Sequence, residues 1–397
     1  MLPTAISAAL RSYGELKALK EERGISEAAA AKAGLYPNPV LELGGTTGSS
    51  SENSISLGIS QEFLTGSKRE KRLQVAEKEL AGFDNRFKDA ERLLRLEVKM
   101  VYYDLLLANG RLGLARKSEE LNGQLLRISG ERFAAGEVAE LDLNLARVES
   151  ARAEGRKLEA EQDMAPLQQR MLLLMGASPG EKFHLSGSFD TGAFIGDLAE
   201  LKKQARENRP DLKALKAETE KADAEMALAG ADRLPNVTVG VGYSRENTLT
   251  TLGGMEEKNA NNLIGLKVSV PLPLFDRNQA GWQQATARKY SAESRYLFTL
   301  QRIDREIEAA HVRLTSAQKA VALYRTGIMP QLEQNLKLIQ EAYQLGEVGI
   351  MAVIEEQKKF IEVNDSYLKA LSALNSAAAK LEAAVGMELK KEDGGNK

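Results

Sequence analysis

The chain has 397 residues, no cysteine, and 54 Lys and Arg against 56 Asp and Glu, which gives a formal net charge of −2. Without a basic excess it is a poor candidate for nucleic-acid binding, and without cysteine it cannot form disulfides, thiolate metal sites or a cysteine nucleophile. Its 10 prolines and 5% aromatic residues are few for several compact cores, so we expect an elongated protein.

The beginning of the chain carries no recognisable export signal. MLPTAISAAL lacks the basic region and the long apolar core of a secretory signal peptide. We therefore expect either a processed or truncated chain or a cytosolic protein, and the composition leaves both open. The longest apolar runs, such as MLLLM at 171–175, are much shorter than the ~20 residues of a membrane-spanning helix, so no such helix is expected.

The first half of the chain predicts a helix at about 4–34, a Pro-Asn turn, two strands at about 39–47 and 54–63, and a very long helix at about 67–132. The long helix contains no proline and is rich in good helix formers, and its ~65 residues would extend about 100 Å. In the second strand, branched residues alternate with serines and a glycine, which predicts a sheet with one apolar face. These branched residues are Ile55, Leu57 and Ile59.

The second half predicts the same order of elements. A helix at about 197–233 precedes strands at about 236–244 and 263–271, and a long helix begins at Asp276. Pro330 should kink or break this second long helix. Apolar residues again alternate with small or polar ones along the two strands: Val237, Val239, Val241, Ile264, Leu266, Val268 and Val270.

An internal repeat explains this parallel order. ERFAAGEV at 131–138 matches EAYQLGEV at 341–348, a spacing of 210 residues, whereas the Pro-Asn turns are 198 residues apart. The 12 extra residues predict an inserted loop at about 245–262, between the two strands of the second half. We therefore divide the chain into a first repeat at 1–190 and a second at 191–397, intertwined in one channel unit.

The strands suggest a membrane environment. Short strands with one apolar face and one small or polar face are typical of outer-membrane β-barrels. Four strands cannot close a barrel, and an open sheet edge in lipid leaves backbone groups without partners. We therefore expect two or three copies of the chain to share one barrel. The alternative is a soluble sheet whose apolar face packs on helices.

The duplicated halves, LYPNP and RLPNV before the strand pairs, VPLPLFDRNQA at 270–280 and the two G-E-V turns resemble the TolC family of trimeric outer-membrane efflux proteins. QEFLTGSKREKR at 61–72 and PLPLFDRNQA resemble its heavy-metal-efflux branch. The resemblance implies a mainly α fold with a β-barrel. Duplicated long-helix hairpins would form a trimeric α-barrel tunnel, and four strands per chain would build a shared twelve-stranded barrel. Residues 178–192 and the C-terminal tail would join a belt around the tunnel.

The function implied by this resemblance is a passive exit duct of a tripartite efflux system in a Gram-negative outer membrane, with its tunnel in the periplasm. The implied partners are two further copies of the chain, a periplasmic adaptor, an inner-membrane pump of the RND type and outer-membrane lipid, with no nucleic acid. The cargo would be heavy-metal cations or organic drugs. Two alternatives stay open. One is the adaptor subunit, which would carry a single helical hairpin, and the other is a soluble coiled-coil scaffold, which leaves the alternating strands unexplained.

The resemblance also implies two sets of functional residues. A ring of acidic side chains should narrow the tunnel, where Glu355 matches the ring position and a companion acidic position is Ala352 here. Asp142 takes the corresponding place in the first half. Such a ring attracts cations, and the alternative is a solvated helix face. The G-E-V turns should dock the adaptor, and the alternative for their glycines is a plain helix C-cap. The docking residues are Phe133, Gly136, Glu137, Val138, Tyr343, Gly346, Glu347 and Val348.

A joint between barrel and tunnel is predicted where the last strand ends. Pro271 and Pro273 should stop strand pairing, and Asp276 should cap the following helix. GSKREKR at 66–72 places cations in the first turns of a helix, where the helix dipole disfavours them, so lipid headgroups or simple solvation should offset their charge. Trp282 is a candidate for an interfacial aromatic girdle or for an ordinary helix contact.

No residue pattern points to catalysis or to a bound cofactor. His184 and His311 form no His-x-x-x-His pair, and the sequence has no Walker loop and no Gly-x-Ser-x-Gly motif. We therefore expect neither an enzyme nor a dedicated metal site, even if metal ions are the cargo.

Overall fold

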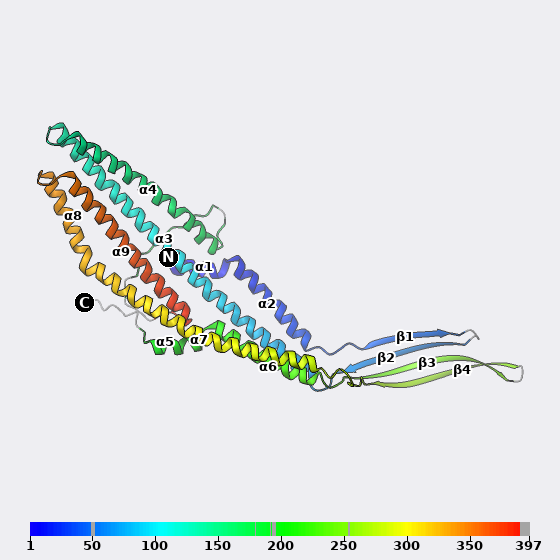
Figure 1. Cartoon of the computed structure of the whole chain (residues 1–397). Coiled ribbons are helices and arrows are strands. Elements are labelled where there is room, and N and C mark those ends of the chain that lie inside the picture. The colour runs from blue at the N-terminus through cyan, green and yellow to red at the C-terminus, as the bar shows by residue number, and fades with distance from the viewer. Residues whose placement is uncertain (49–51, 179, 191, 193–195, 253–254, 390–397) are drawn as a thin grey trace. The chain divides into compact units, whose positions relative to one another are not determined.

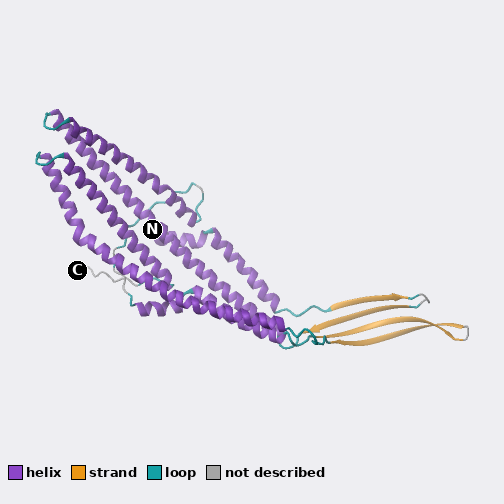
Figure 2. Cartoon of the chain, viewed as in Figure 1, coloured by secondary structure: helices purple, strands orange, loops and turns teal. Residues whose placement is uncertain are grey.

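The computed structural model describes the chain except residues 49–51, 179, 191, 193–195, 253–254 and 390–397, and at 250–252 and 255–256 it describes only the backbone. Helices dominate the described residues, and the strands form one sheet (Figure 1, Figure 2). The helices are α1 Leu2–Ser12, α2 Gly14–Ala33, α3 Lys68–Ala134, α4 Glu140–Leu174, α5 Leu198–Asn208, α6 Pro210–Ala231, α7 Gln279–Leu323, α8 Met329–Gln344 and α9 Ile350–Val385. The strands are β1 Val40–Thr47, β2 Asn53–Phe63, β3 Val237–Leu252 and β4 Met255–Ser269.

The predicted fold class, mainly helical with four strands per chain, is confirmed. The long helix α3 has 67 residues, close to the predicted range. Among the described helices, none combines the length and the apolar character that crossing a membrane requires.

Two helices that the sequence predicts as continuous are each divided in the structure. Tyr13 separates α1 from α2 with φ −61° and ψ 122°, and Arg209 separates α5 from α6 with φ −63° and ψ 120°. At Arg209 the cause is the next residue, because Pro210 disfavours a helical conformation in the residue before it and itself suits a helix start. Each break lies three positions before a copy of LKALK, so the break occupies the equivalent position in the two halves of the chain.

The predicted break at Pro330 is confirmed. α7 ends at Leu323, a π-helical turn covers Tyr324–Ile328, and α8 begins at Met329 with the proline in its first turn. Proline has no N–H to donate to the preceding turn, so the regular α-helical hydrogen bonds are interrupted there. The backbone forms a wider π-helical turn before the proline, and a new α-helix begins at it.

The sheet has the order β1-β2-β3-β4, and all neighbours are antiparallel. Its pairing register places apolar side chains in rows on one face, as in the row of Leu43, Leu57, Tyr243 and Ile264. The other face carries small or polar residues, and one of its rows consists of Glu42, Gly58, Gly242 and Gly265.

The prediction of an inserted loop at 245–262 is wrong. β3 and β4 pair through this segment, from Arg245 opposite Asn262 out to Leu252 opposite Met255. The apolar alternation that marks a strand stops near Ser244, because the segment is polar on both faces. Backbone pairing needs no apolar side chains, so the insertion lengthens the strand pair.

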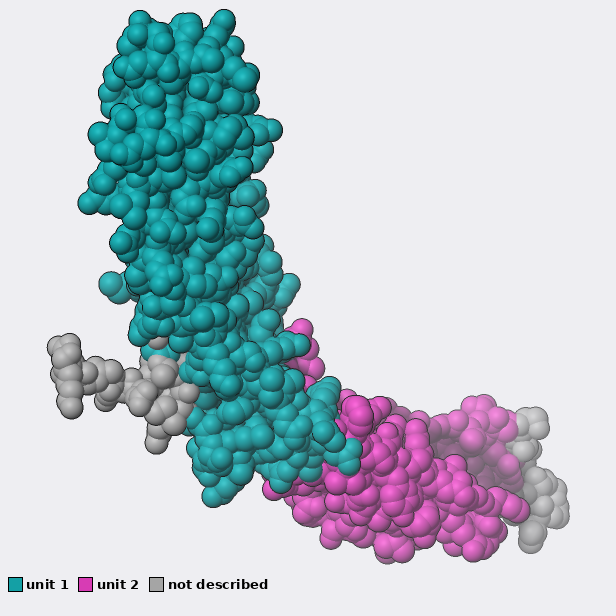
Figure 3. Space-filling model, turned by 60° about the vertical axis from the view of Figure 1, so that its left-hand side comes forward, with its two compact units in different colours: residues 1–20, 87–210, 299–397 teal, residues 21–86, 211–298 magenta. Residues whose placement is uncertain are grey.

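The chain divides into two compact units (Figure 3). Unit 1 comprises 1–20, 87–210 and 299–397, and unit 2 comprises 21–86 and 211–298. Each unit therefore draws segments from both halves of the chain, and α3 and α7 contribute to both units.

The core of unit 1 lies between α1, α3 and α4, and it includes Ala5, Ala9, Val98, Leu105, Met171 and Leu174. An extended segment packs on this core through Phe183, Leu185 and Phe189. The Tyr102 hydroxyl donates to the carbonyl oxygen of Ser186 at 2.6 Å, and Asn375 of α9 exchanges two hydrogen bonds with the backbone of Asp190. The segment predicted to join a belt therefore packs on the helices of unit 1. The C-terminal tail at 390–397, which was predicted to join it, lies outside the described residues.

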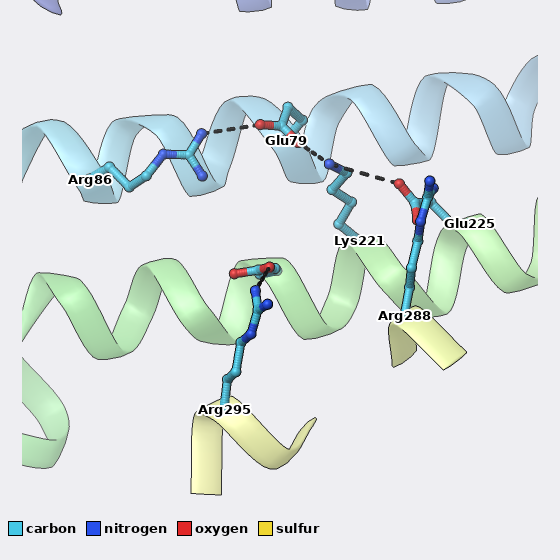
Figure 4. A network of polar contacts seen from close by, with 7 residues as sticks. Glu79, Arg86, Lys221, Glu225, Arg288 and Arg295 are labelled. Atoms are coloured by element: carbon cyan, nitrogen blue, oxygen red, sulfur yellow. Dashed lines mark hydrogen bonds and ion pairs between the residues drawn. The ribbon is translucent and has the colours of Figure 1, made fainter. Parts of the chain in front are cut away.

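In unit 2, ion pairs tie α6 to α3 and α7 (Figure 4). Lys221 of α6 pairs with Glu79 of α3, and Arg288 of α7 reaches Glu225 of α6 at 3.3 Å. Burial raises the pKa of Glu79, but hydrogen bonds from Lys221 and Arg86 outweigh it, so the pKa lies below its usual value. Each pair is partly exposed and contributes little alone, but together they favour one placement of α6.

Candidate functional site

The two G-E-V turns have the same backbone geometry. In the first, Gly136 has φ +77°, its N–H donates to the carbonyl of Phe133, and the N–H of Glu137 donates to the carbonyl of Arg132. Gly346 in the second turn has φ +78°, with the equivalent bonds from its own N–H and from that of the next residue. This pattern closes a helix with a left-handed residue, a conformation in which a side chain is unfavourable.

A side-chain cluster joins the two turns within unit 1. Tyr343 of α8 is only 2% exposed, and its hydroxyl lies 2.9 Å from Ser129 Oγ of α3. The Arg132 guanidinium lies 5.1 Å from the centre of the Tyr343 ring and donates to the Tyr343 carbonyl oxygen at 3.0 Å. The same guanidinium pairs with Glu137 of the first turn at 3.2 Å. Arg132 therefore connects both turns.

The burial of Tyr343 corrects its expected place on a docking surface. Its ring fills the contact between α3 and α8, so a partner cannot reach it. Phe133, at the equivalent position of the first half, is 40% exposed and Leu345 is 75% exposed. Val138 and Val348 are half-buried, and the remaining turn residues are exposed. The accessible surface of the turns thus includes Phe133, Leu345, Gly136, Gly346, Glu137 and Glu347.

The two gate candidates lie near the beginnings of the helices that follow the turns. Glu355 is in the second turn of α9 and is exposed. Asp142 is in the first turn of α4 and is half-buried. Neither carboxylate has an ion pair with another described residue.

The joint after β4 differs in part from its prediction. Strand pairing ends at Ser269, two residues before Pro271. Asp276 does not cap α7, because that helix begins only at Gln279. Its carboxylate instead accepts a hydrogen bond from the N–H of Asn278 at 2.8 Å, and Asn278 has φ +55° at the helix entry. The chain between Pro271 and Asn278 is neither strand nor helix, and it bends before α7 begins.

The first two cations of the basic run at 66–72 form hydrogen bonds within unit 2. Lys68 is buried, and its ammonium donates to the Leu234 carbonyl oxygen at 2.6 Å and to Asn236 Oδ1 at 2.7 Å. Arg69 donates to the carbonyl oxygen of Gly34. The carbonyl and amide oxygens thus offset the unfavourable helix dipole for the first of these cations.

The apolar face of the sheet is uncovered in the described chain. Ile264 is 83% exposed, and most of the other residues predicted to face lipid are exposed as well: Ile55, Leu57, Ile59, Val241, Leu266, Val268 and Val270. Val237 and Val239 are half-buried. This exposure contradicts the alternative of a soluble sheet packed on helices, and an apolar face of this extent requires another apolar environment.

The comparisons with known proteins identify the family. The model of the outer membrane efflux protein family matches residues 15–177 and 201–387. The chain belongs to this family. The membership confirms the predicted resemblance and separates the chain from the adaptor subunit and the coiled-coil scaffold.

Several known proteins are similar over most of the chain. The cobalt-zinc-cadmium resistance protein CzcC of Cupriavidus metallidurans is 25% identical over 97% of this chain and 90% of its own length. The outer membrane protein TolC of Vibrio cholerae is 20% identical over 79% of this chain and 72% of its own length. The crystal structure of CusC shares the fold with a TM-score of 0.79 and 19% identity, covering 97% of this chain and 92% of that one.

One ionic cluster of this efflux-family chain was not predicted. Glu149 of α4 is buried, and its carboxylate accepts hydrogen bonds from Lys358 of α9 at 2.9 Å and from Arg152 at 3.2 Å, while Arg156 lies 3.8 Å away. Burial raises the pKa of Glu149, but the hydrogen bonds from the cations outweigh it and hold the pKa below its usual value. The cluster ties α4 to α9. A signal in the sequence was the spacing of Arg152 three residues after an acid, but nothing there indicates Lys358.

Replacing Glu149 with glutamine should destabilise the chain at neutral pH by about 1 kcal/mol, because the charge-assisted bonds are lost and the partners are half-exposed. A lowered carboxyl pKa stabilises the fold above the unfolded pKa of about 4.3 and loses that effect as the pH falls through the folded value. The difference in melting temperature between Glu149→Gln and the original chain should therefore shrink below about pH 4.

The matched control for this substitution is Glu154→Gln, because Glu154 is an exposed acid of the same helix without an ion pair to a described residue. It should leave the melting temperature unchanged at both pH values. Equal melting of Glu149→Gln and the original chain at neutral pH would refute the stabilising role of the cluster.

Proposed function

We propose that the chain is the passive exit duct of a tripartite efflux system, with three copies closing one barrel in the outer membrane. The supporting observation is the uncovered apolar face of a four-stranded sheet in a member of the outer membrane efflux family. In the described chain β1 and β4 each pair on one side only, and such edges need partners in lipid. Three copies supply twelve strands, and each β4 edge then pairs with the β1 edge of the next copy.

In this proposal the helices of the three copies line a tunnel in the periplasm. The exposed residues of the G-E-V turns dock a periplasmic adaptor, and an inner-membrane pump of the RND type supplies the energy. Glu355 and Asp142 each occur three times in such an assembly, so they can form rings of carboxylates. Rings of this kind attract cations and repel anions.

Heavy-metal cations are the proposed cargo. CzcC, which is similar over nearly the whole chain, is named for resistance to cobalt, zinc and cadmium. Carboxylates without ion pairs suit a route for divalent cations, which need no dedicated binding site in order to pass.

The proposed function is tested with a strain that lacks the gene. We expect increased sensitivity to zinc, cobalt, cadmium or copper, restored by the intact gene. The same strain is tested against a panel of organic drugs. Sensitivity to drugs alone would refute heavy metals as the cargo but would still support an exit duct. Unchanged resistance to both metals and drugs would refute the exit-duct function itself. Extraction that requires detergent and an SDS-labile trimer on gels would support the assembly.

A further inference from the structure

A hollow of about 650 Å³ lies in unit 2 beside the joint after β4. Its lining comes from the segment between β4 and α7 and from the end of the α6 region: Arg233, Pro273, Leu274, Phe275, Arg277 and Gln279. Two of these residues are cations, three are apolar, and none is acidic. The hollow is therefore open to an anionic ligand that also has an apolar part.

The two arginines retain donors for such a ligand. The Arg233 guanidinium lies 5.0 Å from the centre of the Trp282 ring, a contact with the face of the ring that leaves its N–H groups free to bind. Arg277 uses Nε for the carbonyl oxygen of Pro273 at 3.3 Å, which leaves its terminal nitrogens. Neither arginine forms an ion pair with a described residue. The nearby Asp276 carboxylate is engaged by the N–H of Asn278.

An apolar row leads from the sheet to this hollow. Val268 belongs to the apolar face of β4, and Val270, Leu272 and Leu274 follow at every second position beyond the end of the strand at Ser269. All four are exposed, and Phe275 at the end of the row is 93% exposed. These residues follow in the chain directly after the face that requires an apolar environment, and their exposed side chains offer an apolar surface to a ligand in the hollow.

The cations at 66–72, which the sequence suggested as lipid contacts, do not line this hollow. Lys68 is buried against carbonyl and amide oxygens, and Arg69 binds a carbonyl oxygen and lies over the Tyr36 ring. Arg233 and Arg277 were not singled out by the sequence, because they are separate in the chain and only the fold places them on one hollow.

We propose that Arg233 and Arg277 bind the phosphate of an anionic phospholipid from the membrane that holds the sheet, with an acyl chain along the row from Val268 to Leu274. Guanidinium groups suit phosphate because their planar donors match its oxygens. The apolar row distinguishes a phospholipid from free phosphate, which would gain nothing from it. The inference rests on the proposed function for its membrane, and it adds a specific lipid contact at the joint.

The test uses Trp282, the single tryptophan of the chain, as its reporter. The purified full chain in neutral detergent is titrated with dibrominated phosphatidylglycerol and, separately, with dibrominated phosphatidylcholine, and quenching of Trp282 fluorescence is followed. We expect the phosphatidylglycerol midpoint to be about thirtyfold lower, as for two cations that each attract an anionic lipid. Equal midpoints for the two lipids would overturn the proposal.

Arg277→Gln is the main variant, because it removes a cation of the hollow without touching the ring of the reporter. It should reduce the preference about fivefold, and adding Arg233→Gln should abolish it. Arg295→Gln is the matched control, since Arg295 pairs with Glu218 elsewhere in unit 2 and does not line the hollow. A full preference in the Arg277→Gln, Arg233→Gln double variant, or its loss in the control, would refute the assignment.

Two further measurements distinguish the outcomes. Sodium phosphate should not displace the brominated lipid at comparable concentration, and displacement would identify a site for free phosphate and overturn the lipid. The metal sensitivity of the deletion strain is measured independently of the lipid titration. If the chain prefers phosphatidylglycerol but does not restore metal resistance, the lipid site is supported and the exit-duct function is refuted. If the chain restores resistance but shows no lipid preference, the exit-duct function is supported and the lipid site is refuted.

Discussion

Replacing Gly346 with leucine should abolish export while the trimer still assembles. Gly346 has φ +78°, where a side chain costs roughly 1–2 kcal/mol, and an added Cβ would lie 3.3 Å from Arg132 Nη2. The turn would therefore shift, and the arginine that connects the two turns would move with it. Metal tolerance of the complemented deletion strain measures export, and SDS gels of unheated samples measure the trimer.

Two other glycines provide the controls. Gly349 has φ −82° and no atom within 4 Å of an added Cβ, so Gly349→Ala should export normally. Gly136 has φ +77° but open space around it, so Gly136→Leu tests the backbone conformation without a clash on the arginine. Normal export by Gly346→Leu with intact trimers would count against the docking role of the turn.

Replacing Glu355 with alanine should weaken the cation preference of the channel in planar bilayers. A ring of three carboxylates in water stabilises a passing cation by on the order of 1 kcal/mol, so the cation-to-anion permeability ratio should fall about fivefold. Asp142→Ala should act in the same direction and add to the effect if both rings line the tunnel.

Glu333→Ala serves as the control for charge alone. Glu333 is an exposed acid of α8 that forms no ion pair with a described residue, and it lies outside the proposed ring. Its replacement should leave the permeability ratio unchanged. If Glu355→Ala leaves both the conductance and the ratio unchanged, the gate assignment is wrong.

The first two strands and the longest helix could be predicted because their signals are local. Alternation of apolar and small residues marked β2 to within about a residue of its observed ends, and a long stretch without proline that is rich in helix formers marked α3. The breaks at Tyr13 and Arg209 were missed, since a short break leaves the composition of a helix unchanged. Pro210 carried a usable signal for the second break.

The side-chain arrangement at the turns could not be predicted, because the repeat treats equivalent positions alike. Phe133 and Tyr343 occupy the same place in the two halves, yet one is exposed and the other is buried against Ser129 and Arg132. Only the packing of α3 on α8 distinguishes them. The hydroxyl of Tyr343 was the available clue, because a buried tyrosine usually needs a hydrogen-bond partner.

The helix start at Gln279 and the ionic contact of Glu149 with Lys358 were missed for a related reason. Asp276 is an excellent N-cap residue, but its carboxylate closes a turn with the N–H of Asn278 instead, and the helix begins only at Gln279. The contact between Glu149 and Lys358 joins residues 209 positions apart, and sequence periodicity carries no information on such pairs.

The glycine row of the sheet has a consequence for what the strand unit can discriminate. Gly58, Gly242 and Gly265 lie side by side on three neighbouring strands, so at this level the small face presents only main chain over most of its width. The peptide groups there are already engaged in the ladder and offer the same chemistry to every solute. Discrimination by charge on this face therefore depends on the few ionised side chains that interrupt it, among them Glu42 at the β1 end of the same row and Lys267 two residues beyond Gly265.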